Sequence, residues 1–252
     1  MDSRPQKKFK VLVIGDTCLD IYRYGTVDRL SPEAPVPIFQ VSHEEQRHGM
    51  AANVRANLER LGCAVGVITG NTSVKTRLID QRSKQHIVRI DADSQSQPAV
   101  IFNEIFEEYD AVVVSDYNKG TVTYEVLEQI QQNFSGPVFV DTKKTDLARL
   151  NRCIIKINAL EHSRIISGCT DLIVTQGGDG AVYYSDGAEH QYPGVTVEVS
   201  DVTGAGDTFL AALAYQYLVT KHMKSAIEFA IRASAVTVQH FGVYAPALEE
   251  IR

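Results

Sequence analysis

The stretch Lys10-Val11-Leu12-Val13-Ile14-Gly15-Asp16 decides the fold class of this chain. An unbroken apolar run, closed by a glycine and an aspartate, predicts a strand that is buried on both faces and ends in a turn. Similar apolar runs recur at residues 111–114, 137–140, 153–155 and 172–175. Several runs are followed by polar residues, namely Asp16, Asp116, Asp141, Asn158 and Gln176.

Stretches with helical periodicity separate these predicted strands. They cover residues 51–61, 124–134 and 159–166. Alternating strands and helices are typical of an α/β fold, with an open, mostly parallel sheet that helices cover on both faces. Ligands of such sheets bind at the carboxyl ends of the strands, so the polar residues named above mark the expected site.

Two regions break this alternation. Residues 21–44 carry Pro32, Pro35 and Pro37 between short β-prone pieces and cannot form a helix. Two further β-prone pieces, at 74–79 and 86–90, flank a polar turn. We expect the segments 21–44 and 74–91 to form a small antiparallel β sheet, which stands off the main sheet and serves as a lid over the substrate.

The last third of the chain contains β-prone pieces at 182–184 and 195–197, then a glycine turn, then helical stretches at 207–219 and 225–241. The first of these helical stretches is apolar nearly all round, which predicts a buried helix. No clear linker divides the sequence, so we expect a single domain over residues 1–252.

Charge and composition exclude several classes of protein. The net charge is −6 and the 25 basic residues are dispersed, which argues against nucleic acid or an anionic membrane surface as a partner. The chain shows neither a signal peptide nor an apolar run of membrane-spanning length, so we expect a cytoplasmic protein. The four cysteines are far apart and are expected to be buried, reduced thiols without a zinc site.

The stretch Asp201-Val202-Thr203-Gly204-Ala205-Gly206-Asp207 carries the chemistry. A glycine turn that opens a helix presents unpaired backbone N–H groups and the positive end of the helix dipole, which can hold phosphate oxygens. Asp207 would stand in the first helical turn, where it can accept the proton of a sugar hydroxyl during phosphoryl transfer. The alternative is a glycine turn whose acidic residue only stabilises the start of the helix.

Residues 201–209, which read Asp-Val-Thr-Gly-Ala-Gly-Asp-Thr-Phe, resemble the signature of the ribokinase, or phosphofructokinase-B, family of carbohydrate kinases. The resemblance implies a three-layer sandwich with a mostly parallel central sheet and a small antiparallel β lid. It also implies a kinase that uses ATP and Mg²⁺. Under this resemblance Asp207 is the catalytic base, and Gly204, Ala205 and Gly206 form the anion hole.

Three further stretches, 13–20, 30–37 and 115–120, resemble the heptose-7-phosphate kinase branch of that family, which supplies ADP-heptose for lipopolysaccharide. This likeness implies that the anomeric hydroxyl of D-glycero-D-manno-heptose 7-phosphate is phosphorylated to the 1,7-bisphosphate. The substrate-binding residues that it implies are Asp16, Asp20, Gly49, Asn53, Asp116 and Lys119. Aspartates at strand ends are otherwise common turn formers, so a purely structural role stays open for them.

Asn158-Ala159-Leu160-Glu161 resembles the family's Asn-x-x-Glu motif, which implies that Asn158 and Glu161 help to hold Mg²⁺, largely through water. The same spacing fits a helix-capping box, and the two roles are compatible. The nucleotide contacts that the resemblance implies are Thr175, Gly178 and Thr203. For the glycine turn at 177–180, a role in a hairpin alone stays open.

The chain departs from the family pattern at three places. Gly49-Met50 stands where the family has a glycine pair, only three residues separate Gly70 from Val74, and a helix between residues 161 and 171 is trimmed. These losses remove scaffold and keep the chemical motifs. We therefore expect a narrower sheet in a compact, active kinase.

Other interpretations stay open at this stage. The chain could encode a kinase for another sugar or a nucleoside, or a regulatory protein that binds nucleotide or sugar without turnover. A homodimer formed through the β lid is a hypothesis. The chain ends at Arg252, so we expect no nucleotidyltransferase domain of the kind that some heptose kinases carry.

Overall fold

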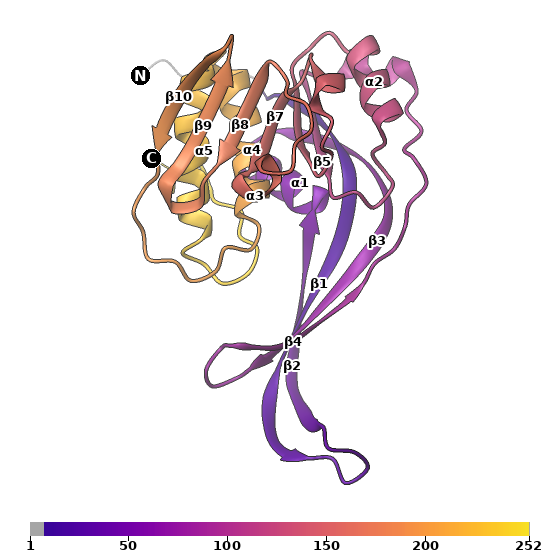
Figure 1. Cartoon of the computed structure of the whole chain (residues 1–252), viewed down its shortest axis with the longest axis vertical. Coiled ribbons are helices and arrows are strands. Elements are labelled where there is room, and N and C mark those ends of the chain that lie inside the picture. Colours follow the sequence, from indigo (N-terminus) through magenta and orange to yellow (C-terminus); the bar gives the residue numbers. More distant parts are fainter. Residues whose placement is uncertain (1–7, 252) are drawn as a thin grey trace.

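The computed structural model describes residues 8–251. Within this range, ten strands form one sheet in the order β10-β9-β8-β7-β6-β5-β1-β3-β4, with β2 paired to β1 (Figure 1). The strands are β1 (Lys10–Leu30), β2 (Pro37–Met50), β3 (Ala64–Asp80), β4 (His86–Ala92), β5 (Ala111–Asp116), β6 (Val138–Thr142), β7 (Ile154–Asn158), β8 (Asp171–Thr175), β9 (Gly180–Ser185) and β10 (Ala188–Pro193). The helices are α1 (Ala51–Arg60), α2 (Tyr124–Asn133), α3 (Ala159–His162), α4 (Ala205–Thr220) and α5 (Met223–Thr237).

The central sheet is covered on both faces, as the sequence predicts. Val11 and Val13 of β1 belong to a core shared with α1, α4 and α5, whereas Leu12 and Ile14 belong to a core shared with α2. Successive side chains of a strand point to opposite faces, so a strand covered on both faces is apolar throughout. The five predicted apolar runs coincide, within a residue or two, with strands of this sheet, and β3, β1, β5, β6, β7 and β8 run parallel.

The lid is built by the strands of the body itself. β1 and β3 continue beyond the body as a parallel pair that reaches Gly25 and Asp80 (Figure 1). β5 pairs with β1 as far as Gly15, and β2 pairs with β1 from Thr17 onward. Within the lid, only the pairs β1–β2 and β3–β4 are antiparallel. The predicted antiparallel pairing of the lid is thus present in these two pairs. The lid is not a separate sheet, because β1 and β3 run on from the body and make it a mixed extension of the main sheet.

Several element ends differ from the sequence prediction. α3 ends at His162 and not at residue 166, because the N–H of Ile166 donates to the carbonyl of Thr145 and the chain turns away. The β-prone residues 195–197 have no strand partner and form no strand. α4 begins two residues before its predicted start, and α5 ends at Thr237 instead of residue 241. The predicted burial of α4 is confirmed along most of its length.

No helix within residues 8–251 is long and apolar enough to cross a membrane. Cys18, Cys63 and Cys153 are buried, Cys169 is half-buried, and all four are free thiols. Burial raises the pKa of Cys18 to about 12, so this thiol stays protonated and unreactive at neutral pH.

Candidate active site

The glycine turn forms the start of α4. Gly204 precedes the helix with a φ of 82°, a left-handed conformation that favours glycine. Within residues 8–251, the N–H groups of Gly206 and Asp207 donate to no acceptor. The N–H of Ala205 donates to the carbonyl of Val202 at 3.3 Å. The turn therefore offers free N–H groups and the helix dipole to an anion, although the N–H of Ala205, one of the predicted donors, is already in use.

Asp207 lies in the first turn of α4 and is only 3% exposed. Asn53 Nδ2 donates to its Oδ2 at 2.9 Å, and the Tyr117 hydroxyl donates to its Oδ1 at 3.0 Å. Burial raises the pKa of Asp207 to about 6; repulsion from Asp141 adds to this rise, and the two hydrogen bonds oppose it. A carboxylate with this pKa is ionised at neutral pH yet basic enough to accept a proton.

Asn53 comes from α1, which follows β2 without a loop. Asn57 Nδ2 donates to Asn53 Oδ1 at 3.1 Å, and this contact leaves the Asn53 amide nitrogen facing Asp207. Met50 joins the two elements with φ 58° and ψ −133°. Such a conformation costs a residue other than glycine about 1–3 kcal/mol. The family's glycine pair is thus replaced by a strained methionine, whose burial offsets part of that cost.

Asp20 lies on β1 where the lid leaves the body. Its carboxylate forms a buried ion pair with Arg77 of β3 and accepts a hydrogen bond from the Cys18 thiol at 3.5 Å. Gly49 packs directly against it, since a side chain at Gly49 would stand 2.5 Å from Asp20 Oδ2. The structure therefore brings two predicted substrate residues, Asp20 and Gly49, into contact, and adds Arg77, which the sequence did not single out.

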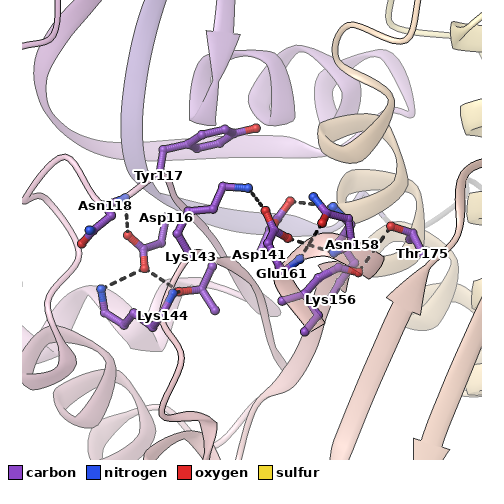
Figure 2. Close-up of polar contacts among 12 residues, drawn as sticks. Asp116, Tyr117, Asn118, Asp141, Lys143, Lys144, Lys156, Asn158, Glu161 and Thr175 are labelled. Carbon is purple, nitrogen blue, oxygen red and sulfur yellow. Dashed lines mark hydrogen bonds and ion pairs between the residues drawn. The ribbon is translucent and has the colours of Figure 1, made fainter. Parts of the chain in front are cut away.

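Asp16 and Asp116 hold the loop that follows β5. Asp16 is fully buried, and its carboxylate accepts from the N–H groups of residues 117, 119 and 121 at 2.8, 3.0 and 3.3 Å. Asp116 accepts from Thr142 Oγ1 at 2.6 Å and from Lys144 Nζ at 2.9 Å (Figure 2). Both carboxylates are occupied by the protein itself. These contacts fit the alternative role of shaping a turn, and the substrate contacts of Asp16 and Asp116 stay a prediction.

Tyr117 was not predicted, although it lies inside the 115–120 stretch. Burial raises the pKa of its hydroxyl well above the usual value, so the hydroxyl stays a donor to Asp207. Lys75 Nζ and Lys143 Nζ lie 5.8 and 5.0 Å from the centre of its ring. Lys119, a predicted substrate residue, pairs with Asp93 at 2.5 Å. Several ammonium groups thus lie near this part of the site, which suits an anionic acceptor.

A second buried pair, Asp141 and Lys156, joins the ends of β6 and β7. Lys156 Nζ donates to Asp141 Oδ2 at 2.7 Å, and both side chains are about nine-tenths buried or more (Figure 2). The sequence carries a signal for this pair that was not used: a single lysine interrupts the apolar run of residues 153–157.

Asn158 and Glu161 form the capping box of α3. Asn158 Oδ1 accepts from the N–H of Glu161 at 2.9 Å, and Glu161 Oε2 accepts from the N–H of Asn158 at 2.8 Å. Glu161 Oε1 pairs with Lys143 (Figure 2). Within residues 8–251 no group of three or more His, Cys, Asp or Glu side chains could hold a metal ion. The donor set fits a Mg²⁺ that keeps most of its water and is carried by nucleotide phosphates.

A cavity of about 450 Å³ lies beside the glycine turn. Thr175 and Gly178 line it, together with Ala205, Gly206 and the mainly apolar segment 194–199. Thr203 does not line the cavity, because its N–H and hydroxyl both bond Asp201 Oδ1, at 2.9 and 2.8 Å. The structure therefore places two of the three predicted nucleotide residues at one cavity, and it gives Thr203 a role in shaping the turn.

Comparison with known proteins bears on this arrangement. Residues 156–251 match the model of the pfkB family of carbohydrate kinases. The bifunctional protein HldE of a Nitratiruptor species is 34% identical over 298 aligned positions, covering 97% of this chain and 64% of the relative. Residues 156–251 therefore belong to the pfkB family of carbohydrate kinases. HldE of Helicobacter pylori is 32% identical to this chain, with 96% of this chain and 65% of the relative covered.

The chain spans 64–65% of the length of these two relatives. The first alignment, at 298 positions, is longer than the 252 residues of this chain, so the relative carries residues between the matched segments that are absent here. This difference agrees with the trimmed segments noted in the sequence.

Solved structures show the fold of this chain. Ribokinase from Thermotoga maritima superposes with a TM-score of 0.74 at 18% identity, covering 96% of this chain and 98% of that one. Ribokinase from Arabidopsis thaliana, solved with ribose and ATP, superposes with a TM-score of 0.76 at 18% identity, with 97% and 98% covered. The fold is ribokinase-like, with a mostly parallel sheet, as predicted.

Proposed function

We propose that this pfkB-family chain is an ATP-dependent kinase of a sugar phosphate. The acceptor that we assign is the anomeric hydroxyl of D-glycero-D-manno-heptose 7-phosphate, and the product is the 1,7-bisphosphate. One observation carries the reaction type: Asp207, buried and with its pKa raised to about 6, lies in the first turn of α4, whose start borders a cavity of about 450 Å³. The stretches 13–20, 30–37 and 115–120 and the similarity to HldE proteins support the acceptor.

Asp207 serves as the base in this proposal. Asn53 and Tyr117 hold its carboxylate by one hydrogen bond to each oxygen, which leaves lone pairs for the acceptor hydroxyl. The hydroxyl is a weak nucleophile at neutral pH, and its proton passes to Asp207 as the bond to phosphorus forms. Asp20, Gly49 and Asn53 supply the acceptor side of the site, and the lysines around Tyr117 favour a phosphorylated sugar.

The nucleotide occupies the cavity on the other side of the glycine turn. Apolar side chains of the segment 194–199 suit the base and ribose of the nucleotide. Thr175 and Gly178 line the same cavity. The free N–H groups of Gly206 and Asp207 then face the phosphates, where the helix dipole adds to the attraction. Mg²⁺, held through water near Asn158 and Glu161, would neutralise part of the charge on these phosphates.

The lid completes the acceptor side and offers a surface to a second copy of the chain. Seven of its larger apolar side chains are exposed, namely Val27, Leu30, Val36, Val41, Ile87, Val88 and Ile90. A group of exposed apolar residues on one small extension is typical of an interaction surface. This observation supports the homodimer through the lid, which is part of the proposal.

An acceptor panel tests the proposed function. ADP release is measured with ATP and Mg²⁺ and, in turn, heptose 7-phosphate, fructose 6-phosphate, ribose and adenosine. We expect the highest kcat/KM with heptose 7-phosphate. Turnover with another acceptor alone would move the assignment to that compound, and ATP binding without turnover of any acceptor would favour a regulatory protein.

A further inference from the structure

Lys156 is a buried cation that follows two isoleucines in β7. It lies on β7 between Ile155 and Ile157, is 4% exposed, and pairs with Asp141 of β6 at 2.7 Å. A buried ion pair adds little to stability when compared with a well-packed apolar pair, because both charges lose their hydration. The fold alone therefore gives no reason for a lysine here.

The ammonium group lies against the glycine turn. A side chain on Gly206 would meet Lys156 Nζ at 2.9 Å, so this glycine lets the main chain of the turn come close to the ammonium. An ammonium has three N–H donors, and within the described part of the chain only Asp141 accepts from this one. Lys156 therefore keeps donors available beside the free N–H group of Gly206.

Lys156 stays charged at this position. Burial on its own would lower the pKa of the ammonium, but attraction to Asp141, and then to Glu161 and Asp207, raises the pKa above its usual value. A fixed positive charge on β7 thus lies beside the start of α4. This is the point at which the helix dipole and the free N–H groups also attract an anion.

We propose that Lys156 is a catalytic residue that contacts the phosphoryl group in transfer, while Asp141 orients its ammonium. This inference rests on the proposed function. As the acceptor oxygen bonds to phosphorus, the bond to the leaving ADP oxygen breaks with its electron pair, and the acceptor proton passes to Asp207. Negative charge spreads over the equatorial oxygens, and the ammonium of Lys156 stabilises that charge without giving up a proton.

Paired variants test this role. Lys156→Met alone would leave Asp141 buried without its partner, so the main variant is Lys156→Met with Asp141→Asn, which removes both charges. The matched control is Lys144→Met with Asp116→Asn, which removes another buried lysine–aspartate pair at the loop after β5. Kd for ATP and for ADP is measured for each protein, and kcat is measured with the acceptor found in the panel.

We expect the Lys156 double variant to lower kcat by about 10²–10³-fold, a size typical of losing one transition-state donor. Its Kd for ATP should rise about 10-fold more than its Kd for ADP, whereas the control should keep the parent's ratio of the two. If the Lys156 double variant is folded and keeps the parent's kcat and the parent's ratio of the Kd values for ATP and ADP, the role of Lys156 is overturned. The proposed function would still stand in that case. A parent that bound neither nucleotide would overturn the proposed function, and this inference with it.

Discussion

At the scale of single residues, burial and hydrogen bonding shift the pKa of the Asp207 carboxyl in opposite directions. Burial disfavours its charge, while Asn53 and Tyr117 stabilise that charge by hydrogen bonds, so the pKa reaches about 6 and not a higher value. A base must be deprotonated to act, and the rate should therefore fall as the pH drops below about 6. Tyr117 is the partner that can be removed with the smallest change in shape.

Tyr117→Phe should shift the acid limb of the pH–rate profile to higher pH. The lost hydroxyl lowers the pKa of Asp207 in the parent, so its removal raises that pKa and protonates the base at a higher pH. The measurement is kcat/KM for the acceptor between pH 5 and 8. Tyr244→Phe is the control, because the Tyr244 hydroxyl bonds Glu250 away from the site. Superimposable profiles for the two variants would contradict the assigned contact.

Asp207→Asn should make the protein more stable at pH 7.5. The folded pKa of about 6 lies above the ordinary value of 3.8, so the folded state binds the proton more tightly and loses stability as the pH rises through this window. Removing the buried charge should raise the free energy of unfolding by roughly 1–3 kcal/mol at pH 7.5, with little effect below pH 4. Urea titrations at both pH values check this.

Asp186→Asn, in the exposed turn before β10, is the control for that titration and should change stability little at either pH. If Asp207→Asn and the parent have the same free energy of unfolding at pH 7.5, burial of the ionised Asp207 carboxylate does not destabilise the fold.

The sequence predicted single residues unevenly. Asp207 was predicted because residues 201–209 resemble a family signature, whereas the glycine turn alone left the role of stabilising the helix start open. For Asp16 and Asp116 the sequence left two roles open, because a strand-end aspartate has the same pattern whether it contacts a ligand or holds a turn through backbone N–H groups, as Asp16 does. Lys156 was missed since its partner, Asp141, lies 15 residues away on the neighbouring strand.

At the scale of elements, the lid is tied to the glycine turn by the loop after α5. Arg47 of β2 donates from Nη1 to the carbonyls of Phe241 and Val243 at 2.5 and 3.3 Å. The N–H of Gly242, between them, donates to Asp201 Oδ2 at 2.9 Å, and Asp201 also holds Thr203. The position of the lid strand and the shape of the turn are therefore linked through a few hydrogen bonds.

Arg47→Gln should lower kcat/KM for the acceptor by about 10-fold to 100-fold, the range expected when a charged hydrogen-bond donor is lost. Arg23→Gln is the control, because Arg23 lies on the same lid and pairs with Glu44 at the surface. Steady-state kinetics of both variants give the comparison. Equal effects of the two substitutions would show that the loop contact has no part in the reaction.

The sequence predicted the body elements better than the lid. Apolar runs and helical periods give each body element a local signal, because the parallel strands there are covered on both faces. The prolines and β-prone pieces of the lid were also a local signal, and they identified the lid segments 21–44 and 74–91. Their pairing was not readable, because the parallel contact of β1 with β3 joins residues more than 50 positions apart.

At the scale of the whole molecule, the lid should mediate self-association. Leu30 and Ile90 are 65% and 53% exposed on a narrow extension. Leu30→Asp with Ile90→Asp should convert a dimer into a monomer, since a buried, unpaired charge disfavours the contact. Mass by light scattering tests this. Ile166→Asp, at an exposed position of the body, should leave the parent mass unchanged. A monomeric parent would contradict the dimer.

The whole-molecule fold followed from the sequence because alternating strands and helices leave few ways to cover one sheet. The acceptor did not follow in the same way. The glycine turn and Asp207 indicate the reaction type. The proposed acceptor instead rests on the stretches 13–20, 30–37 and 115–120 and on the similarity to HldE proteins.

The most direct test of the central claim compares the parent with Asp207→Asn in sugar-dependent ADP formation, with ATP, Mg²⁺ and heptose 7-phosphate at saturating concentrations. We expect turnover by the parent and a loss of about 10²–10⁴-fold in kcat for the variant, the usual contribution of a general base. Equal sugar-dependent rates for the two proteins would contradict the assignment of Asp207 as the base.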